Sequence, residues 1–386
     1  MEMKQIAAFL NSAASVVLGK SDIVSEDLTG VVDLGTEVLN QRGVENYTKT
    51  LVDVIGRQIF VIRKYSGRAP SVLMDGWEYG SILEKVTFET PKYSENESWS
   101  LTDGTTYNQD IFKSPKISAK FFSNRTTFEV QISITEKQFK SAMTSAMAAA
   151  SFVEGIYNSI ENSMTLSNDM LISRTINNMI GETIHNDFKT ETDYSLNSYT
   201  RSVNLLKLYK DATGDAAVTA ANCLYNRDFL AFASSMMNEY CARLTGFSTL
   251  FNMGGKERFT PISDQKFIML DQFKSRARAY LYGPTFNADE VRLPDAETVP
   301  YWQGPGTDYS FSKISEVSVK TSGGNTVAIS GVLGVLFDRN ALGVTNYEPR
   351  VTSHYNAKAE FTNMYYKRDA GYFNDGNENF IVFYVA

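Results

Sequence analysis

Residues 127–138 read TFEVQISITEKQ and decide the fold of this chain. In the first eight positions polar and apolar side chains alternate, which is the period of a β-strand with one buried face. The next four, Thr135 to Gln138, match a capping box, in which a hydroxyl and a side-chain amide satisfy free N–H groups at a helix start. The stretch therefore predicts a strand that passes directly into a helix.

The helical pattern that follows is exceptionally long. Apolar residues recur at spacings near three and four from Thr135 to about Ile184, with no proline among them. An unbroken helix from Ala146 to Ile184 would be about 58 Å long at 1.5 Å per residue. Gly155 and the polar pair Ser167-Asn168 could bend or split this helix, so the pattern alone leaves its continuity open.

Two β-type passages precede the opening stretch. Val86 and Phe88 alternate with polar residues, a similar alternation covers 116–121, and a polar, turn-prone segment separates the two. We therefore predict an extended hairpin over 57–134, with a further β-type run at 59–62. An isolated ribbon buries little and is marginally stable. The hairpin consequently implies a partner surface.

The N-terminal 56 residues contain two short amphipathic patterns, one over 6–17 and one over 44–56. Glycines and turn-prone sequence separate them. Small pieces without a large core predict an extended arm that packs on another molecule.

The middle of the chain has mixed elements. Asn226 is a favourable N-cap for a helix, 267–270 resembles a short strand, 271–282 a second helix, and 327–337 contains buried strands. The proline-rich segment 294–309 predicts a long loop.

The C-terminal residues 344–386 predict antiparallel β-structure. Alternation over 355–362 indicates a strand, Asn374-Asp375-Gly376-Asn377 a hairpin turn, and 380–385 a buried closing strand. Together with the long helix, this element order predicts an α+β fold.

Composition narrows the class of protein. A chain of 386 residues exceeds one simple core, so two or three lobes are expected. No apolar run approaches the ~20 residues that span a bilayer, and we expect no membrane contact. The net charge of −7 without a basic stripe argues against a dedicated nucleic-acid binder. Cys223 and Cys241 are expected to be buried, reduced thiols.

Motifs for enzyme chemistry are weak. Only two histidines occur, His185 and His354, and neither has a metal-ligand spacing. Gly19-Lys20-Ser21 resembles the end of a phosphate loop but lacks its first glycine. The carboxylates Glu95, Glu97 and Asp103 lie in a solvated tip that cannot hold them at a set separation. We therefore expect no catalytic residue, no metal, no cofactor and no enzymatic activity, while a carboxylate-dependent hydrolase stays a third alternative.

The chain resembles major capsid proteins of tailed bacteriophages with the HK97-type fold. The resemblance rests on the hairpin Phe60–Ile134, the capped long helix from Thr135 and the closing stretch Val327 to Ala386. It extends to short segments, namely 70–75, 116–122 and 174–180, which are similar to segments of capsid proteins from phages and prophages of Gram-positive bacteria. The resemblance covers essentially the whole chain as an overall pattern, without a short diagnostic motif.

The resemblance implies a division of the chain. Residues 1–56 would form an N-terminal arm and 57–134 an extended E-loop. Residues 135–190 and 344–386 would form a peripheral domain with a spine helix and antiparallel sheet, and 191–343 a mixed α/β axial domain.

The resemblance also implies a function and partners. Subunits would self-assemble into pentameric and hexameric capsomers of an icosahedral shell around double-stranded DNA, which they would contact non-specifically. We expect a virion capsid location after assembly in the host cytoplasm, a portal, and a separate scaffolding protein because the sequence begins almost directly at the arm. An encapsulin-like compartment shell is the alternative.

If the hairpin clamps a neighbouring subunit, particular residues should lie at that contact. Covalent cross-linking between a hairpin lysine (85, 92, 113 or 116) and Asn356 is a minor possibility, because lysine and asparagine are common in these regions. We nominate five inter-subunit contacts, which are Phe88, Phe121, Phe128, Ile132 and Lys116.

Overall fold

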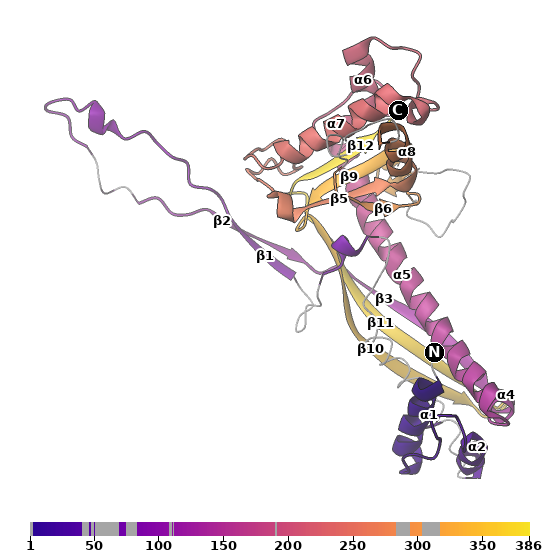
Figure 1. The fold of residues 1–386 in the computed structure, drawn as a ribbon. Helices are drawn as coiled ribbons and strands as arrows, with labels where there is room; N and C mark the ends of the chain where they lie inside the picture. Colours follow the sequence, from indigo (N-terminus) through magenta and orange to yellow (C-terminus); the bar gives the residue numbers. More distant parts are fainter. Residues whose placement is uncertain are drawn as a thin grey trace.

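The computed structural model describes residues 3–40, 46–47, 50, 69–74, 83–107, 110, 112–189, 191–282, 294–302 and 317–386. One long helix runs beside two separate β-sheets, and a thin hairpin projects far from the body (Figure 1). The predicted α+β class is confirmed.

The long helix α5, Ala146–Phe188, is continuous through Gly155 over 43 residues, or about 64 Å at 1.5 Å per residue. The predicted capping box at Thr135 is present, but it begins the short helix α4, Glu136–Ala142. The prediction of a single helix from Thr135 is therefore wrong. The chain turns after α4, and Ser145 caps α5 separately by accepting from the Ala148 N–H.

A three-stranded antiparallel sheet lies against the N-terminal half of α5. Its order is β10 (Leu342–Asn356), β11 (Phe361–Asn374) and β3 (Arg125–Thr135). Strand β3 contains residues 127–135, and it pairs with β11 from Arg125↔Gly371 to Thr135↔Phe361. Its assignment to the hairpin over 57–134 was therefore wrong.

The predicted strand over 355–362 is also wrong, because residues 357–360 form the turn between β10 and β11. The Asn356 side-chain oxygen accepts from the backbone N–H groups of Lys358 and Ala359, which closes this turn. Alternation of side chains continued through the turn and concealed it.

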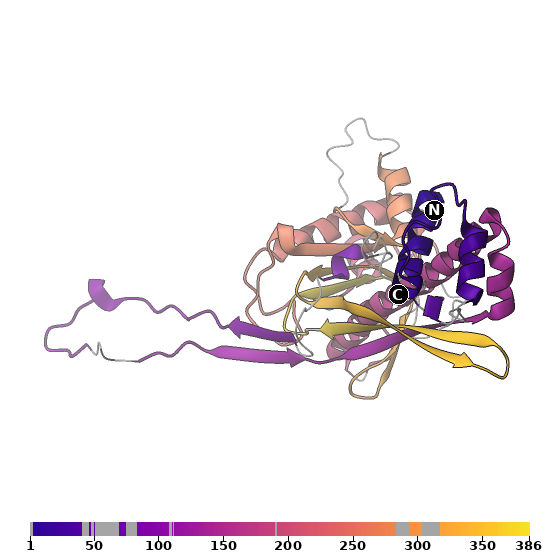
Figure 2. The same cartoon turned by 90° about the horizontal axis from the view of Figure 1, so that it is seen from below.

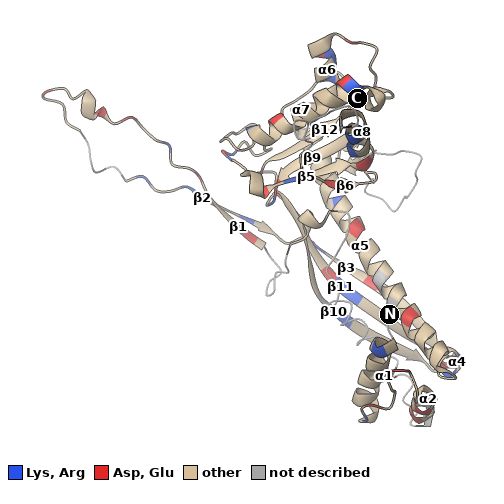
Figure 3. Ribbon diagram, viewed as in Figure 1, with Lys and Arg blue, Asp and Glu red and all other residues tan. Residues whose placement is uncertain are grey.

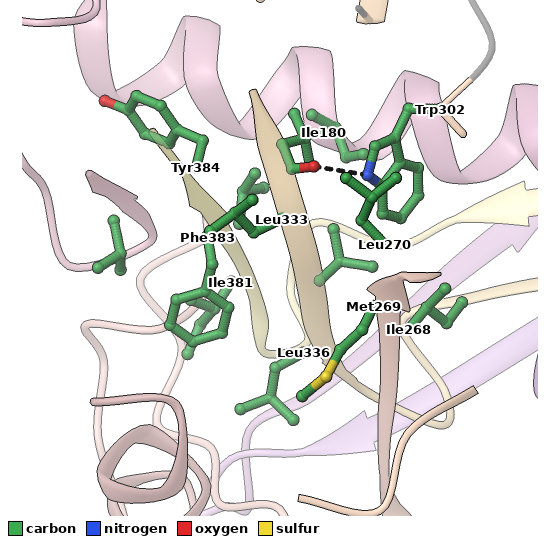
Figure 4. Close-up of a cluster of buried hydrophobic side chains, with 14 of the residues drawn as sticks. Ile180, Ile268, Met269, Leu270, Trp302, Leu333, Leu336, Ile381, Phe383 and Tyr384 are labelled. Carbon is green, nitrogen blue, oxygen red and sulfur yellow. Dashed lines mark hydrogen bonds between the residues drawn. The ribbon is translucent and has the colours of Figure 1, made fainter. Parts of the chain in front are cut away.

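The larger lobe contains a five-stranded mixed sheet in the order β4-β12-β9-β5-β6. Its bounds are β4 Ser202–Asn204, β5 Gln265–Leu270, β6 Glu297–Val299, β9 Val332–Asp338 and β12 Phe380–Tyr384. Figure 4 shows its side chains packed with Ile180 of α5, and Trp302 Nε1 donates to the Val332 carbonyl at 2.8 Å.

Three expectations change in this lobe. The closing strand β12 is buried as predicted, but it pairs with β4 and β9 rather than completing the peripheral sheet. The turn at 374–377 consequently leads from one sheet to another and makes no hairpin. The short strand β6 lies inside the segment predicted as a loop, of which 303–309 are outside the described residues.

Helices α6 (Leu205–Thr213), α7 (Arg227–Arg243) and α8 (Asp271–Tyr282) complete the larger lobe. Asn226 caps α7 as predicted, since its side chain accepts from the Phe229 N–H at 2.9 Å. A small antiparallel pair, β7 (Val317–Lys320) and β8 (Thr326–Ile329), lies against α5.

The N-terminal helices form a second core with the N-terminal half of α5. Helix α1 (Met3–Leu18) buries Leu10 and its neighbours beside α2 (Val31–Asn40), α4 and the three-stranded sheet. The expectation that this segment packs on another molecule is therefore wrong for α1 and α2. Of the helix predicted over 44–56, the structure describes residues 46, 47 and 50, which are helical; the β-type run at 59–62 lies outside the described residues.

Candidate functional site: the projecting hairpin

The projecting hairpin begins as a short antiparallel ribbon. Strand β1 (Leu83–Phe88) pairs with β2 (Ile117–Phe122) from Leu83↔Phe122 to Phe88↔Ile117. Beyond the ribbon the chain runs outward, bearing the short 3₁₀ helix η2 (Glu97–Trp99), before it returns (Figures 1 and 2). The predicted alternation in both strands is confirmed. The paired ribbon and its tip cover 83–122, however, and not the predicted 57–134.

The two faces of this ribbon have opposite character. Cross-strand partners share a face, so Lys85 and Lys120 lie on one side, and Phe88 and Ile117 on the other. The side with the lysines turns toward the subunit's own body, where acidic groups bind them. The opposite side exposes large apolar groups, namely Val86, Phe88, Ile117 and Phe121, which are 48–65% exposed.

The outer part of the hairpin is also apolar and exposed. Trp99 is 99% and Phe112 88% exposed, and Tyr93 is 96% exposed. Single exposed apolar side chains are normal on soluble proteins. A thin projection that carries this many of them is a candidate contact surface, because large exposed patches mark interaction sites.

The five nominated contact residues divide into two groups. Phe88, Phe121 and Lys116 lie on the hairpin and are exposed. Phe128 and Ile132 belong to β3 instead, where both are half-buried against the subunit's own cores. The structure thus brings three of the five together on one projection, and gives the other two an intramolecular packing role.

An ion-pair cluster anchors the ribbon to the body. Lys85 Nζ lies 2.9 Å from Asp375 Oδ2 and 2.6 Å from Glu378 Oε1, and Lys120 Nζ lies 2.9 Å from Asp375 Oδ1. Both carboxylates belong to the turn between β11 and β12. Arg258, in the loop after α7, approaches Glu378 at 3.5 Å.

The electrostatics of Asp375 reflect this arrangement. Burial by itself raises the pKa of its carboxyl, but hydrogen bonds from Lys85 and Lys120, the charge of Lys85 and the Asn377 N–H outweigh that effect. The pKa of Asp375 is consequently lowered, and the carboxylate is ionised at neutral pH. A further ion pair at 2.9 Å joins Lys256 to Glu89 at the end of the ribbon.

Sequence reasoning did not identify this anchor. Lys85 and Asp375 are 290 positions apart, and each residue type is common on surfaces. The turn signal at 374–377 located Asp375 in a turn, but no local pattern connects that turn with the hairpin.

The other residues considered for chemistry are dispersed. His185 lies in the last turn of α5, with Nε2 3.3 Å from Asn325 Nδ2, and His354 is an exposed residue of β10. Cys223 and Cys241 are free; Cys223 is buried as expected, whereas Cys241 is only half-buried. Burial raises the pKa of each thiol to about 11. Across the described ranges, no group of three or more His, Cys, Asp or Glu side chains could hold a metal ion.

The carboxylates of Glu95, Glu97 and Asp103 lie exposed near the hairpin tip. Within the part of the chain that the structure describes, no helix has the length and apolar character needed to cross a membrane.

Comparisons with solved structures show the same fold in phage particles. A capsid structure of Staphylococcus phage Andhra is similar at 11% identity, with 84% of this chain and 86% of that chain covered and a TM-score of 0.52. A structure of the head fiber and inner core protein gp22 of native bacteriophage P68 is similar at 11% identity, with 83% and 85% covered and a TM-score of 0.50. No curated protein matches the chain.

The family comparison covers nearly the whole sequence. A model of the Phi29-like phage major capsid proteins matches residues 10–384. The encapsulin-like alternative is not favoured. This match, joined to the capsid fold and the projecting apolar hairpin, shows that the chain belongs to the Phi29-like phage major capsid protein family and is a shell-forming subunit of the virion capsid.

Proposed function

We propose that the subunits assemble through the hairpin into five- and six-membered capsomers that tile an icosahedral shell around double-stranded phage DNA. The observation that supports this proposal is the outward apolar face of the β1–β2 ribbon. In a solitary soluble domain the apolar face of a ribbon packs inward and the polar face meets water. Here Lys85 faces the body and Phe88 faces outward, so burial of the apolar face requires another molecule.

The projecting shape suggests the type of symmetry. A hairpin on one side of a subunit that binds a different surface of the next subunit makes a head-to-tail contact, and such contacts close into rings when the rotation permits. Burial of apolar surface contributes about 25 cal/mol per Å². Several large side chains per hairpin, repeated around a ring, would then stabilise a capsomer.

The charge of the chain is compatible with a container for DNA. With a net charge of −7, the subunit has no general attraction for phosphates. Contact with packaged DNA would be non-specific. We also propose that the subunit has no enzymatic activity. A portal and a scaffolding protein are the partners that the capsid role implies, with assembly in the host cytoplasm.

Negative-stain electron microscopy of the purified, concentrated subunit tests this proposal, alone and after co-expression with its neighbouring genes. Shells, tubes or rings of five or six subunits are the expected result. Small, compact particles under both conditions would contradict it, and would direct attention to acidic-residue variants in hydrolase assays.

A further inference from the structure

Charge is segregated along the hairpin. The acidic tip, residues 94–107, contains Glu95, Glu97 and Asp103 but no lysine or arginine in its sequence. The basic shoulder comprises Lys92 on the outgoing leg and Lys113 and Lys116 on the returning leg. Figure 3 shows lysine and arginine in blue and aspartate and glutamate in red along the chain. All three shoulder lysines are exposed. The hairpin therefore presents opposite charges at two positions along its length.

An apolar cleft adjoins the basic shoulder. Its hairpin wall includes Pro91, Lys92 and Tyr93, and its body wall includes Phe247 and Leu250, around a volume of about 750 Å³. Phe247 and Leu250 are 64% and 61% exposed. The Phe247 ring packs against the Phe259 ring in a tilted arrangement, with the ring centroids 4.6 Å apart. A smaller hollow of about 440 Å³ lies between the legs, beside Lys92, Lys113 and Lys116.

The tip cannot reach its own shoulder. Both legs are extended, and η2 lies at the far end of the projection, away from the body (Figures 1 and 2). Trp99, the last residue of η2, is 99% exposed there. Trp99 is an aromatic group suited to an apolar cleft, but it lies far from the cleft of its own chain. A second copy of the chain has the matching surface.

We infer that the acidic tip of one subunit docks on the basic shoulder of the next copy, with Trp99 in the apolar cleft beside Phe247. This inference rests on the proposed capsomer function and names the surfaces that meet. The contact is head-to-tail, so each copy contributes one tip and one shoulder. Tryptophan is a frequent anchor of interfaces, and opposite charges at the rim orient the encounter and disfavour wrong partners.

The acidic groups near the cleft do not cancel this complementarity. Glu89 is already paired with Lys256 at 2.9 Å, and this bond lowers the pKa of the Glu89 carboxyl. Glu257 lines the body wall of the cleft. Lys92 lines the same cleft, and all three shoulder lysines line the adjoining hollow. Three lysines therefore oppose the carboxylate of Glu257 in local charge.

Charge reversal tests the contact. We expect the shoulder variant Lys113→Glu/Lys116→Glu and the tip variant Glu95→Lys/Glu97→Lys each to reduce shell yield at least tenfold, measured by sedimentation and electron microscopy. A chain carrying all four substitutions should recover at least half of the wild-type yield, because tip and shoulder are again of opposite charge. Lys358→Glu, at an exposed turn far from the hairpin, is the matched control and should assemble normally.

A cysteine pair checks the position of Trp99. Oxidised shells of Trp99→Cys/Leu250→Cys should give a ladder of disulfide-linked subunits on non-reducing gels, whereas each single variant gives monomer bands. Normal assembly of both charge variants, failure of the fourfold variant to recover, or absence of the ladder would each overturn the inference. If both charge variants assemble normally, only the tip-to-shoulder contact is refuted and the capsomer proposal stands. If the wild-type chain itself forms no shells, the capsomer proposal is contradicted.

Discussion

Lys85, on the first strand of the hairpin, donates to Asp375 at 2.9 Å across 290 positions of sequence. The Asp375 side chain is 2% exposed and that of Lys85 19%. This contact, shared with Glu378 and Lys120, holds the polar face of the ribbon against the body. The apolar face is thereby presented to other molecules, so an intramolecular ion pair orients an intermolecular surface.

The first prediction concerns the strength of this anchor. Lys85→Met should lower the free energy of unfolding by about 1–3 kcal/mol, because buried carboxylate oxygens lose a partner. Urea unfolding of the dilute, unassembled subunit measures the change. The matched control is Lys120→Met, whose lysine contacts the same carboxylate but is 43% exposed and should cost less. Equal effects would show that the depth of burial does not decide the contribution.

Acid should weaken the same anchor. The pKa of Asp375 is lowered in the folded subunit relative to its ordinary value of 3.8. Its stabilising contribution is therefore complete above pH 3.8, and is lost as the pH falls below that value through the lower folded pKa. The urea midpoint of the wild-type subunit should fall between pH 6 and pH 3 by more than that of Asp375→Asn. Parallel curves for the two proteins would contradict the assignment.

Two glycines in α5 should respond oppositely to alanine. A Cβ at Gly155 meets nothing within 4 Å, so Gly155→Ala should stabilise the subunit by about 0.4–1 kcal/mol. A Cβ at Gly181 would lie 2.8 Å from Val319 Cβ, so Gly181→Ala should destabilise it by about 1–3 kcal/mol. Thermal unfolding of both variants provides the comparison, and a stabilised Gly181→Ala would contradict the packing of β7 on the helix.

The N-terminal helix should matter to a single subunit. Leu10 is fully buried in the second core, and Leu10→Ala should cost about 2–5 kcal/mol in unfolding free energy. Val16, on the same helix but 71% exposed, serves as the control, and Val16→Ala should stay within about 0.5 kcal/mol. If Leu10→Ala left subunit stability unchanged but prevented assembly, α1 would pack on a neighbour as the sequence had suggested.

Charged substitutions should separate folding from assembly. Phe88→Asp and Phe121→Asp alter exposed side chains, so the subunit should keep its unfolding midpoint while shells disappear from electron micrographs. Phe128→Asp should lower the midpoint, because Phe128 packs against the larger core. Loss of stability in all three variants would show that the ribbon also supports the subunit's own fold.

The sequence by itself determined those features whose signals lie within a few residues. The capping box at Thr135 and the cap at Asn226 join a side chain to an N–H three residues ahead, and both are present. The helix predicted over 271–282 has those bounds, and the strands in 327–337 were likewise predictable. Hydrophobic spacing also indicated the long helix, but it did not reveal the break between α4 and α5.

Only the tertiary structure decided which strands pair and which faces are covered. Alternation in 127–134 suits a hairpin partner as well as β11, since both would bury the same face. The polar pair at 167–168 does not interrupt α5, and the Asn168 side chain accepts from buried Arg368 of β11. The Lys85 anchor likewise joins distant segments. Such contacts depend on the path of the whole chain, and this is why no local pattern could reveal which face of the hairpin is presented to a neighbour.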